Sequence, residues 1–208
     1  MRDETNFLTK IEYERLLDAI PRMKMFLTDH KAEPVPMRST EFRPDDLRLL
    51  FKVIYEGALR VSEAISLTPD DLIIDGRVIK LEGTKGTKKA KRKQKREFAN
   101  VKSDTFDELV RRSKRMHHEK RLFPVHRVTV WRWIKEIGEI ASISLYHEAK
   151  DTTNVTVHTL RHSRALHFVE SGQPINVVQK KLRHRSLQPT TTYLNININK
   201  LKEVEDDI

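Results

Sequence analysis

The sequence contains no cysteine, and this absence excludes several kinds of chemistry. A chain without thiols has no disulfide scaffold, no cysteine nucleophile and no cysteine-ligated zinc. Long apolar runs are also missing, because none reaches the roughly 18 residues that a membrane-spanning helix requires. The first residues, Met1, Arg2, Asp3 and Glu4, do not begin the apolar segment of a signal peptide. We therefore expect a soluble protein of the cytoplasm.

Acidic residues are scarce in the middle of the chain. Residues 80–135 contain nineteen lysines and arginines against six aspartates and glutamates, whereas residues 1–50 contain nine against ten. The middle therefore carries a local charge of +13, more than the +10 of the whole chain. A concentrated basic field attracts a polyphosphate partner, but basic clusters are also often only solvated. Composition alone leaves nucleic-acid binding at about even odds.

Apolar periodicity, prolines and capping residues predict a mainly helical chain. Thr9 and Glu12 have the spacing of a capping box, and Pro44 suits the first turn of a helix. With 208 residues the chain is long enough to bury a core without a disulfide or a metal. The predicted helices cover residues 10–20, 44–57, 61–65, 103–118, 129–140, 158–171 and 174–182.

One small sheet interrupts these helices. Residues 73–74 and 78–81 form a predicted β-hairpin around Asp75-Gly76, a dipeptide that supplies the positive φ angles of a tight turn. A third strand returns at residues 98–101, and the polar residues 144–156 are predicted to be a loop. The fold class is therefore α+β, mainly α-helical with one three-stranded antiparallel sheet.

His158 and Arg161 are three residues apart in a predicted helix, so their side chains share one face. A histidine offers a nitrogen that titrates near neutral pH, and an arginine offers a fork that matches phosphate oxygens. Such a pair usually consists of exposed surface residues without a functional role, so by itself it is weak evidence of a site.

Tyr193 follows His184 by nine residues. A lone tyrosine is more often a half-buried core residue than a nucleophile, because its ordinary pKa of about 10 keeps it protonated at neutral pH. A nucleophilic tyrosine needs cations and a base beside it. The residues that supply them, if the fold gathers them, are Arg60, Arg161, His158 and His184.

Phosphodiester exchange makes the same demand. Attack on phosphorus builds negative charge on the non-bridging oxygens, and the leaving oxygen needs a proton. Two arginines, a lysine and histidines meet both needs without a metal. We therefore expect neither a metal nor a cofactor.

Four segments in order resemble the motifs of the tyrosine recombinases, also called phage integrases. Each motif alone is modest, but four in the right order, with the spacing from histidine to tyrosine intact, are a strong signal. The resemblance runs from about Leu8 to Tyr193. The segments are Ala58–Glu63, Gly83–Lys88, Val157–Ser163 and Leu182–Leu187.

The resemblance implies a role for each matching residue. Arg60 and Arg161 would clamp the scissile phosphate, and Lys85 would protonate the leaving 5′ oxygen. His158 would serve in general acid–base work at the tyrosine. The two remaining roles belong to His184, which would bind a non-bridging oxygen, and Tyr193, which would become 3′-phosphotyrosine.

The sequence departs from the family pattern around the second histidine. Arg183 stands where the family commonly has glycine, and an arginine is strained there if the backbone needs a positive φ. Arg185 stands where a small residue is common. Two interpretations stay open: the two arginines make extra contacts with phosphate, or they displace His184 from its position. Lys85 competes for the lysine role with Lys88 and Lys89, but its place between two glycines suits a hairpin tip.

The resemblance implies one catalytic domain over residues 1–208. Residues 1–43 form an N-terminal helical part, residues 44–193 the catalytic core and residues 194–208 a C-terminal tail. The family's core-binding domain, which completes a clamp around DNA, is absent from this sequence.

Several other residues can be interpreted either as structural or surface residues or as functional ones. Trp131 and Trp133 face different sides of one helix, and we expect Trp131 in the core. His117, His118 and His126 lack a further ligand at metal spacing and are expected on the surface. Basic residues near the hairpin are expected to contact DNA rather than to form a nuclear localisation signal; they are Lys88, Lys89, Lys91, Arg92, Lys93, Lys95 and Arg96.

The resulting hypothesis is a site-specific recombinase or integrase of a mobile element, acting in DNA integration and recombination through a phosphotyrosine intermediate. Its partners would be double-stranded DNA, at the nucleoid, and copies of itself. We expect a tetramer on DNA, a monomer without DNA and no membrane contact. Two alternatives stay open: a catalytically idle DNA-binding accessory module, and a type IB topoisomerase with the same chemistry.

Overall fold

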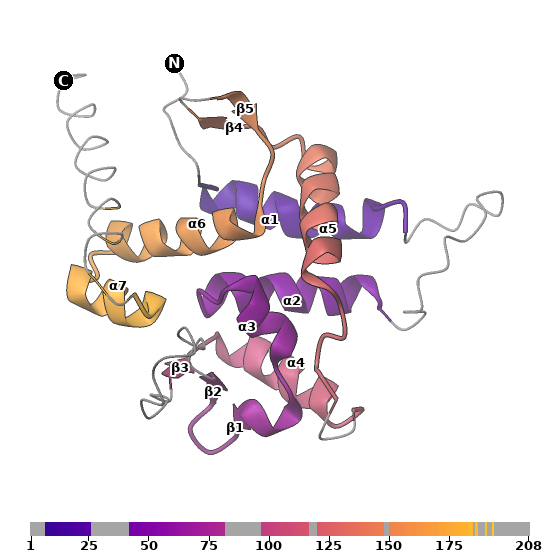
Figure 1. Cartoon of the computed structure of the whole chain (residues 1–208), viewed down its shortest axis with the longest axis vertical. Coiled ribbons are helices and arrows are strands. Elements are labelled where there is room, and N and C mark those ends of the chain that lie inside the picture. The colour runs from indigo at the N-terminus through magenta and orange to yellow at the C-terminus, as the bar shows by residue number, and fades with distance from the viewer. Residues whose placement is uncertain are drawn as a thin grey trace, which may run out of the picture.

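The computed structural model describes residues 7–25, 42–81, 97–116, 120–147 and 150–184, together with Ser186, Thr190 and Tyr193. Helices dominate these residues, as the sequence predicts (Figure 1). None of the helices in this described part is both long and apolar enough to cross a membrane. The helices are α1 (Lys10–Ala19), α2 (Pro44–Glu56), α3 (Val61–Ser66), α4 (Ser103–Ser113), α5 (Arg127–Ile140), α6 (Val157–Glu170) and α7 (Ile175–Leu182), with short 3-10 turns at Ile20–Arg22 and Pro69–Asp71.

Helix α1 begins at the capping box that the sequence predicts. The Thr9 side chain accepts a hydrogen bond from the backbone N–H of Glu12 at 3.2 Å, and the Glu12 carboxylate accepts one from the backbone N–H of Thr9 at 2.9 Å. These two bonds satisfy N–H groups that have no partner inside the helix. One side of the helix buries Leu16 and Leu17 in the main core.

Helix α2 forms the centre of the core and packs against α6. It starts at Pro44, with Asp45 and Asp46 at the positive end of the helix dipole, as predicted. It ends at Glu56, but Gly57 does not adopt the left-handed conformation that often stops a helix. The next residue, Ala58, has φ = 46° instead. A tight turn held by a non-glycine residue therefore precedes Arg60.

The three-stranded antiparallel sheet has the order β1 (Leu72–Ile73), β2 (Val78–Leu81) and β3 (Glu97–Ala99), which confirms the predicted sheet. The hairpin turn differs from the prediction. Arg77, with φ = 49°, is the positive-φ residue, and its N–H bonds the carbonyl of Ile74 at 3.1 Å. The prediction of positive φ angles at Asp75-Gly76 was wrong, because the loop between the paired strand residues has four residues, 74–77, rather than the three expected, 75–77.

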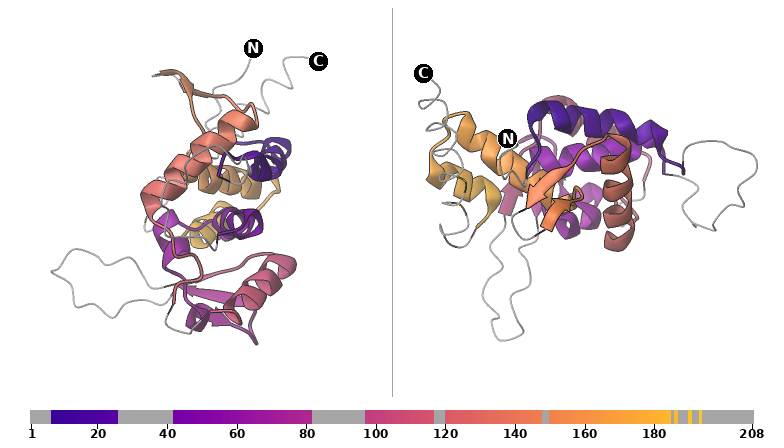
Figure 2. Two further views of the ribbon diagram at one scale, coloured as in Figure 1. Left: turned by 90° about the vertical axis from the view of Figure 1, so that its right-hand side faces the viewer. Right: turned by 90° about the horizontal axis from the view of Figure 1, so that it is seen from above.

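Residues 144–156 are not only a loop. They contain a second antiparallel hairpin, β4 (Leu145–His147) and β5 (Lys150–Thr153), which projects beyond α5 in Figures 1 and 2. The residues of these two strands are mostly polar and show no alternating apolar pattern, so the sequence offered no strand signal here.

Helices α4 and α5 differ from the sequence-based predictions in one feature each. Helix α4 ends at Ser113 rather than near His118. On α5 the buried tryptophan is Trp133, 5% exposed, whereas Trp131 is 48% exposed. Two residues two apart must face different sides, and only the fold selects which side meets the core.

Helices α6 and α7 carry the last two motifs and lie side by side (Figure 1). Helix α6 begins at Thr156, whose side chain accepts a hydrogen bond from Thr159 N–H. Helix α7 ends at Arg183, which has φ = 56° and ψ = 40°. The positive φ suspected from the family's glycine is therefore present, and an arginine adopts it at a cost of about 1–2 kcal/mol.

A buried pair joins α2 to α6 away from these motifs. The hydroxyl of Tyr55 and Nδ1 of His167 are 2.6 Å apart, and His167 is 4% exposed. Burial lowers the pKa of His167 below its ordinary value. The folded protein therefore resists protonation that the unfolded chain accepts below pH about 6.5.

We expect the free energy of unfolding to fall as the pH drops from 7 toward 5, because the unfolded state then binds more protons than the folded state. His167→Gln should make this fall shallower, while His126→Gln, at an exposed position, should not. Urea denaturation at several pH values measures the slope, and equal slopes in all three proteins would contradict the assignment.

Candidate active site

Tyr193 lies in a small apolar cluster formed by α6 and α7, and it is only 6% exposed. Its hydroxyl and Nδ1 of His162 are 2.5 Å apart. Burial raises the pKa of the Tyr193 hydroxyl above its ordinary value, and the charge of Arg161 offsets part of that rise. The phenol is therefore protonated at neutral pH and needs a proton acceptor before it can attack.

His162 is that acceptor candidate, because it follows Arg161 on α6 and contacts the hydroxyl directly. Part of its ring is exposed to solvent. Desolvation of the rest lowers the pKa of His162, and positive charge from His158 and Arg161 lowers it further. A neutral imidazole keeps one nitrogen free to accept a proton.

Arg161 is buried, with 6% of its surface exposed. Its two terminal nitrogens donate hydrogen bonds to the carbonyls of Ala58 and Leu182. Burial, together with the charges of Arg183 and Arg60, lowers the pKa of Arg161 to about 10. The guanidinium stays positive at neutral pH, and it ties the turn before α3 to the end of α7.

Arg60 stands at the first turn of α3 and is more accessible, with 33% of its side chain exposed. Its backbone N–H and its Nη1 both donate to the carboxylate of Glu63, each at 2.7 Å. The i, i+3 spacing within α3 brings the two side chains to one face. Glu63 thus fixes the direction of the Arg60 fork while solvent reaches part of it.

Arg183 is buried beside this pair. Its Nη2 donates to Glu63 at 2.8 Å and to the Ala58 carbonyl at 3.0 Å, and its Nη1 donates to the carbonyls of Gly57 and Lys181. The side chain is 3% exposed. Arg183 therefore faces inward.

His184 is half-buried next to the arginines. Its Nδ1 and the Thr190 hydroxyl are 2.9 Å apart, and Gln179 donates a side-chain hydrogen bond to its carbonyl at 3.2 Å. Burial, then the charges of Arg161 and Arg60, lower the pKa of His184 to about 4. A neutral His184 held through Nδ1 leaves Nε2 for a ligand.

Comparison with known proteins identifies the family of this chain. The sequence model of the Phage integrase family matches residues 6–200. The chain belongs to the phage integrase family. Its fold is that of a tyrosine recombinase catalytic domain.

Two tyrosine recombinases illustrate the similarity of this chain to known proteins. Tyrosine recombinase XerA of Pyrococcus furiosus is 31% identical over 202 residues, which cover 92% of this chain and 65% of that protein. XerA of Thermococcus kodakarensis is 28% identical over 206 residues, covering 96% of this chain and 61% of that protein. The chain thus spans about three fifths of the length of these relatives.

Solved structures agree on the fold. A crystal structure of XerA recombinase superposes with a TM-score of 0.65 at 21% identity, covering 100% of this chain and 66% of that one. The catalytic domain of bacteriophage HP1 integrase superposes with a TM-score of 0.60 at 22% identity, covering 91% and 86%. At these identities the likeness concerns the fold alone.

Most of the predicted catalytic residues come together in the described part of the chain. Electrostatic contacts or hydrogen bonds link Arg60, Arg161, His184 and Tyr193. His158 is exposed at the start of α6, and its charge acts on His162. Lys85, Arg185 and the basic residues from Lys88 to Arg96 lie outside the described residues.

Sequence reasoning assigned no role to three residues of this site. Glu63 had a signal, because it stands three residues after Arg60 on a helix. His162 also had one, since it is adjacent to Arg161. Thr190 had none, because a threonine between two motifs does not reveal which histidine it will meet.

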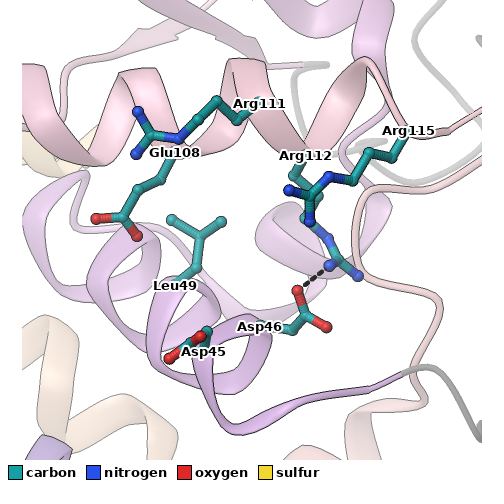
Figure 3. Close-up of a pocket in the computed structure, with 7 residues that line it drawn as sticks. All are labelled: Asp45, Asp46, Leu49, Glu108, Arg111, Arg112 and Arg115. Atoms are coloured by element: carbon teal, nitrogen blue, oxygen red, sulfur yellow. Dashed lines mark hydrogen bonds and ion pairs between the residues drawn. The ribbon is translucent and has the colours of Figure 1, made fainter.

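A separate pocket lies between α2 and α4 (Figure 3). It mixes acidic and basic side chains, and Arg112 pairs with Asp46 inside it. Neither this pocket nor any other group of histidines and carboxylates in the described ranges forms a metal site. The pocket is lined by Asp45, Asp46, Leu49, Glu108, Arg111, Arg112 and Arg115.

We expect His184 to titrate with a pKa of about 4 in histidine NMR spectra of the folded protein. Arg60→Met should raise this value, because it removes a positive charge that disfavours the imidazolium. Arg132→Met, at an exposed position of α5, is the matched control and should leave it unchanged. An equal shift in both variants would show that long-range charge, not local contact, sets the value.

Proposed function

We propose that this chain breaks and rejoins DNA as a site-specific recombinase or integrase, through a covalent bond between Tyr193 and a 3′ phosphate. The observation that carries the proposal is the contact between the buried Tyr193 hydroxyl and His162, with Arg161 acting on both. A tyrosine–histidine contact also occurs at Tyr55 and His167, so the proposal depends on the further presence of Arg60, Arg161 and His184 beside Tyr193.

The reaction follows from the positions of these groups. The Tyr193 oxygen attacks phosphorus, a Tyr–O–P bond forms and the bond from phosphorus to the 5′ oxygen breaks. The phenol proton passes to His162, which is itself accessible to solvent. His158, four residues before His162 on α6, would assist in the general acid–base work at the tyrosine. Rejoining reverses each step, so the energy of the broken bond is kept in the phosphotyrosine.

Charge on the phosphate is the second requirement. Arg60 would bind the non-bridging oxygens, and the buried Arg161, whose terminal nitrogens already donate to the carbonyls of Ala58 and Leu182, would offset with its positive charge the negative charge that builds there. Nε2 of His184 would donate a hydrogen bond to one of these oxygens. Lys85 would give its proton to the leaving 5′ oxygen. No step assigned to these side chains calls for a metal or a cofactor.

Duplex DNA is the proposed substrate, with contacts from the basic residues between Lys88 and Arg96. A related protein, XerH recombinase, has been crystallised with its difH substrate before cleavage. That XerH structure superposes on 91% of this chain with a TM-score of 0.63 at 19% identity. We further propose that recombination takes place in a tetramer on DNA and that the chain is a monomer without DNA.

Two other functions share parts of this site. An idle DNA-binding module would bind DNA without forming an adduct, but the contact of Tyr193 with His162 favours an active enzyme. A type IB topoisomerase would form the same adduct and relax supercoiled circles without a partner site. Recombinant products, as opposed to relaxed circles, separate a recombinase from a topoisomerase.

Tyr193→Phe should abolish covalent adduct formation with a nicked suicide duplex, because it removes only the attacking oxygen. DNA binding should stay normal. Tyr55→Phe is the matched control, since it removes another buried tyrosine hydroxyl but leaves the nucleophile. Denaturing gels score the adduct, and a band formed by Tyr193→Phe would falsify the assignment.

Lys85→Ala should slow cleavage by about 10²–10⁴-fold, the usual contribution of a positioned acid. A substrate with sulfur in place of the leaving 5′ oxygen should restore the rate, because a thiolate departs without a proton. Lys88→Ala and Lys89→Ala are the matched controls and should show neither effect. If the sulfur substrate restores cleavage by Lys88→Ala or Lys89→Ala instead, that lysine and not Lys85 is the general acid.

A further inference from the structure

Arg183 has a left-handed backbone conformation, which is higher in free energy for an arginine than for a glycine. Its φ of 56° lies in the left-handed region, which side chains with a Cβ rarely adopt. A residue that stays there must recover the cost through its contacts. Those contacts are therefore the place to look for its role.

The Arg183 side chain points away from solvent, toward the turn before α3. It donates to the carbonyls of Gly57 and Ala58 and to the carboxylate of Glu63, and its Nε lies 3.7 Å from the Glu97 carboxylate. With 3% of the side chain exposed, no face of the guanidinium is open to a phosphate. Direct contact with DNA is thus a poor account of this arginine.

Glu63 links Arg183 to the phosphate clamp. It is 6% exposed, and it accepts hydrogen bonds from Arg60 on one side and from Arg183 on the other. Burial alone would raise the pKa of Glu63, but the Arg183 guanidinium and the hydrogen bonds from Arg60 hold it below its ordinary value. Glu63 is therefore a carboxylate whose charge must be balanced in place.

The charge balance around Glu63 determines whether Arg60 is available to bind a substrate phosphate. Arg60, Arg161 and Arg183 lie around Glu63, and Glu97 lies 3.7 Å from Arg183, so three guanidinium charges face two carboxylates and the cluster stays positive. If Arg183 were neutral, Glu63 would have Arg60 as its main charged partner. Arg60 would then be drawn into that pair and away from a phosphate oxygen, since one guanidinium cannot serve both fully.

The same contacts fix the backbone of the clamp. Arg161 and Arg183 both donate to the carbonyl of Ala58, the residue with φ = 46° just before Arg60. Because His184 directly follows Arg183, the arginine also connects the histidine to the start of α3. One side chain thus joins the two segments that hold Arg60 and His184.

We propose that Arg183 is a positioning residue: it neutralises Glu63 and locks the Ala58 turn, so that Arg60 remains available to the scissile phosphate. This proposal rests on the proposed function. It differs from a phosphate contact, which would act on DNA affinity, and from simple packing, which would act on stability alone.

The test uses the full chain and a nicked suicide duplex at saturating concentration. Arg183→Met keeps the length of the side chain but removes its charge and donors. Adduct formation should slow by about 10–100-fold, the scale of a misplaced clamp. Affinity for the same duplex, measured by fluorescence anisotropy in the Tyr193→Phe background, should change little.

The decisive arm is a second substitution. Glu63→Gln in the Arg183→Met background removes the carboxylate that would otherwise capture Arg60, so it should restore a large part of the lost rate. Arg183→Lys, which keeps the charge, should also cleave faster than Arg183→Met. A residue needed only for packing would show neither pattern.

The matched control is Arg112→Met in the pocket of Figure 3. Arg112 also pairs with an acidic residue, Asp46, and donates to a backbone carbonyl, that of Leu122. Its loss should lower the melting temperature yet leave the cleavage rate unchanged. If Arg183→Met does not fold, Arg183→Gln carries the same comparison, with and without Glu63→Gln.

The outcomes separate the ideas. Normal cleavage by Arg183→Met, or no recovery with Glu63→Gln, would overturn the positioning role. A loss of affinity with a salt dependence reduced by about one phosphate contact would also overturn it and make Arg183 a DNA ligand. Absence of an adduct in the unsubstituted chain would instead defeat the proposed function, and the inference with it.

Discussion

The arrangement around Glu63 is the constraint on which the site depends. A buried carboxylate is costly unless it is paired, and here Arg60 and Arg183 pair with it from opposite sides. Arg183 and Arg161 then share the carbonyl of Ala58. Segments more than a hundred residues apart in the sequence are thereby fixed to one turn.

This crowding of positive charge shapes the chemistry of the neighbouring groups. Burial lowers the pKa of Arg161 to about 10 and of His184 to about 4, and the neighbouring positive charges add to the effect in each case. Both histidines near Tyr193 are consequently neutral at pH 7, one to accept a proton and one to donate a hydrogen bond. The cluster attracts an anion while keeping its imidazoles out of their charged form.

The rest of the fold provides a stiff support for α6. The backbone N–H of Leu8 bonds the Ser163 hydroxyl at 2.7 Å, and Tyr55 on α2 bonds His167. These contacts hold the helix that carries Arg161 and His162 from two sides. Precise positions of this kind matter because a displacement of about 1 Å can cost about 100-fold in rate.

The sequence alone determined the mainly helical fold, the capping box at Thr9 and the central helix from Pro44, because each depends on residues close together in the chain. Only the tertiary structure decided that His162 meets Tyr193, that Trp133 rather than Trp131 is buried and that Arg183 turns toward Glu63. Local spacing fixes a helix face, but which face meets which neighbour depends on how distant segments pack.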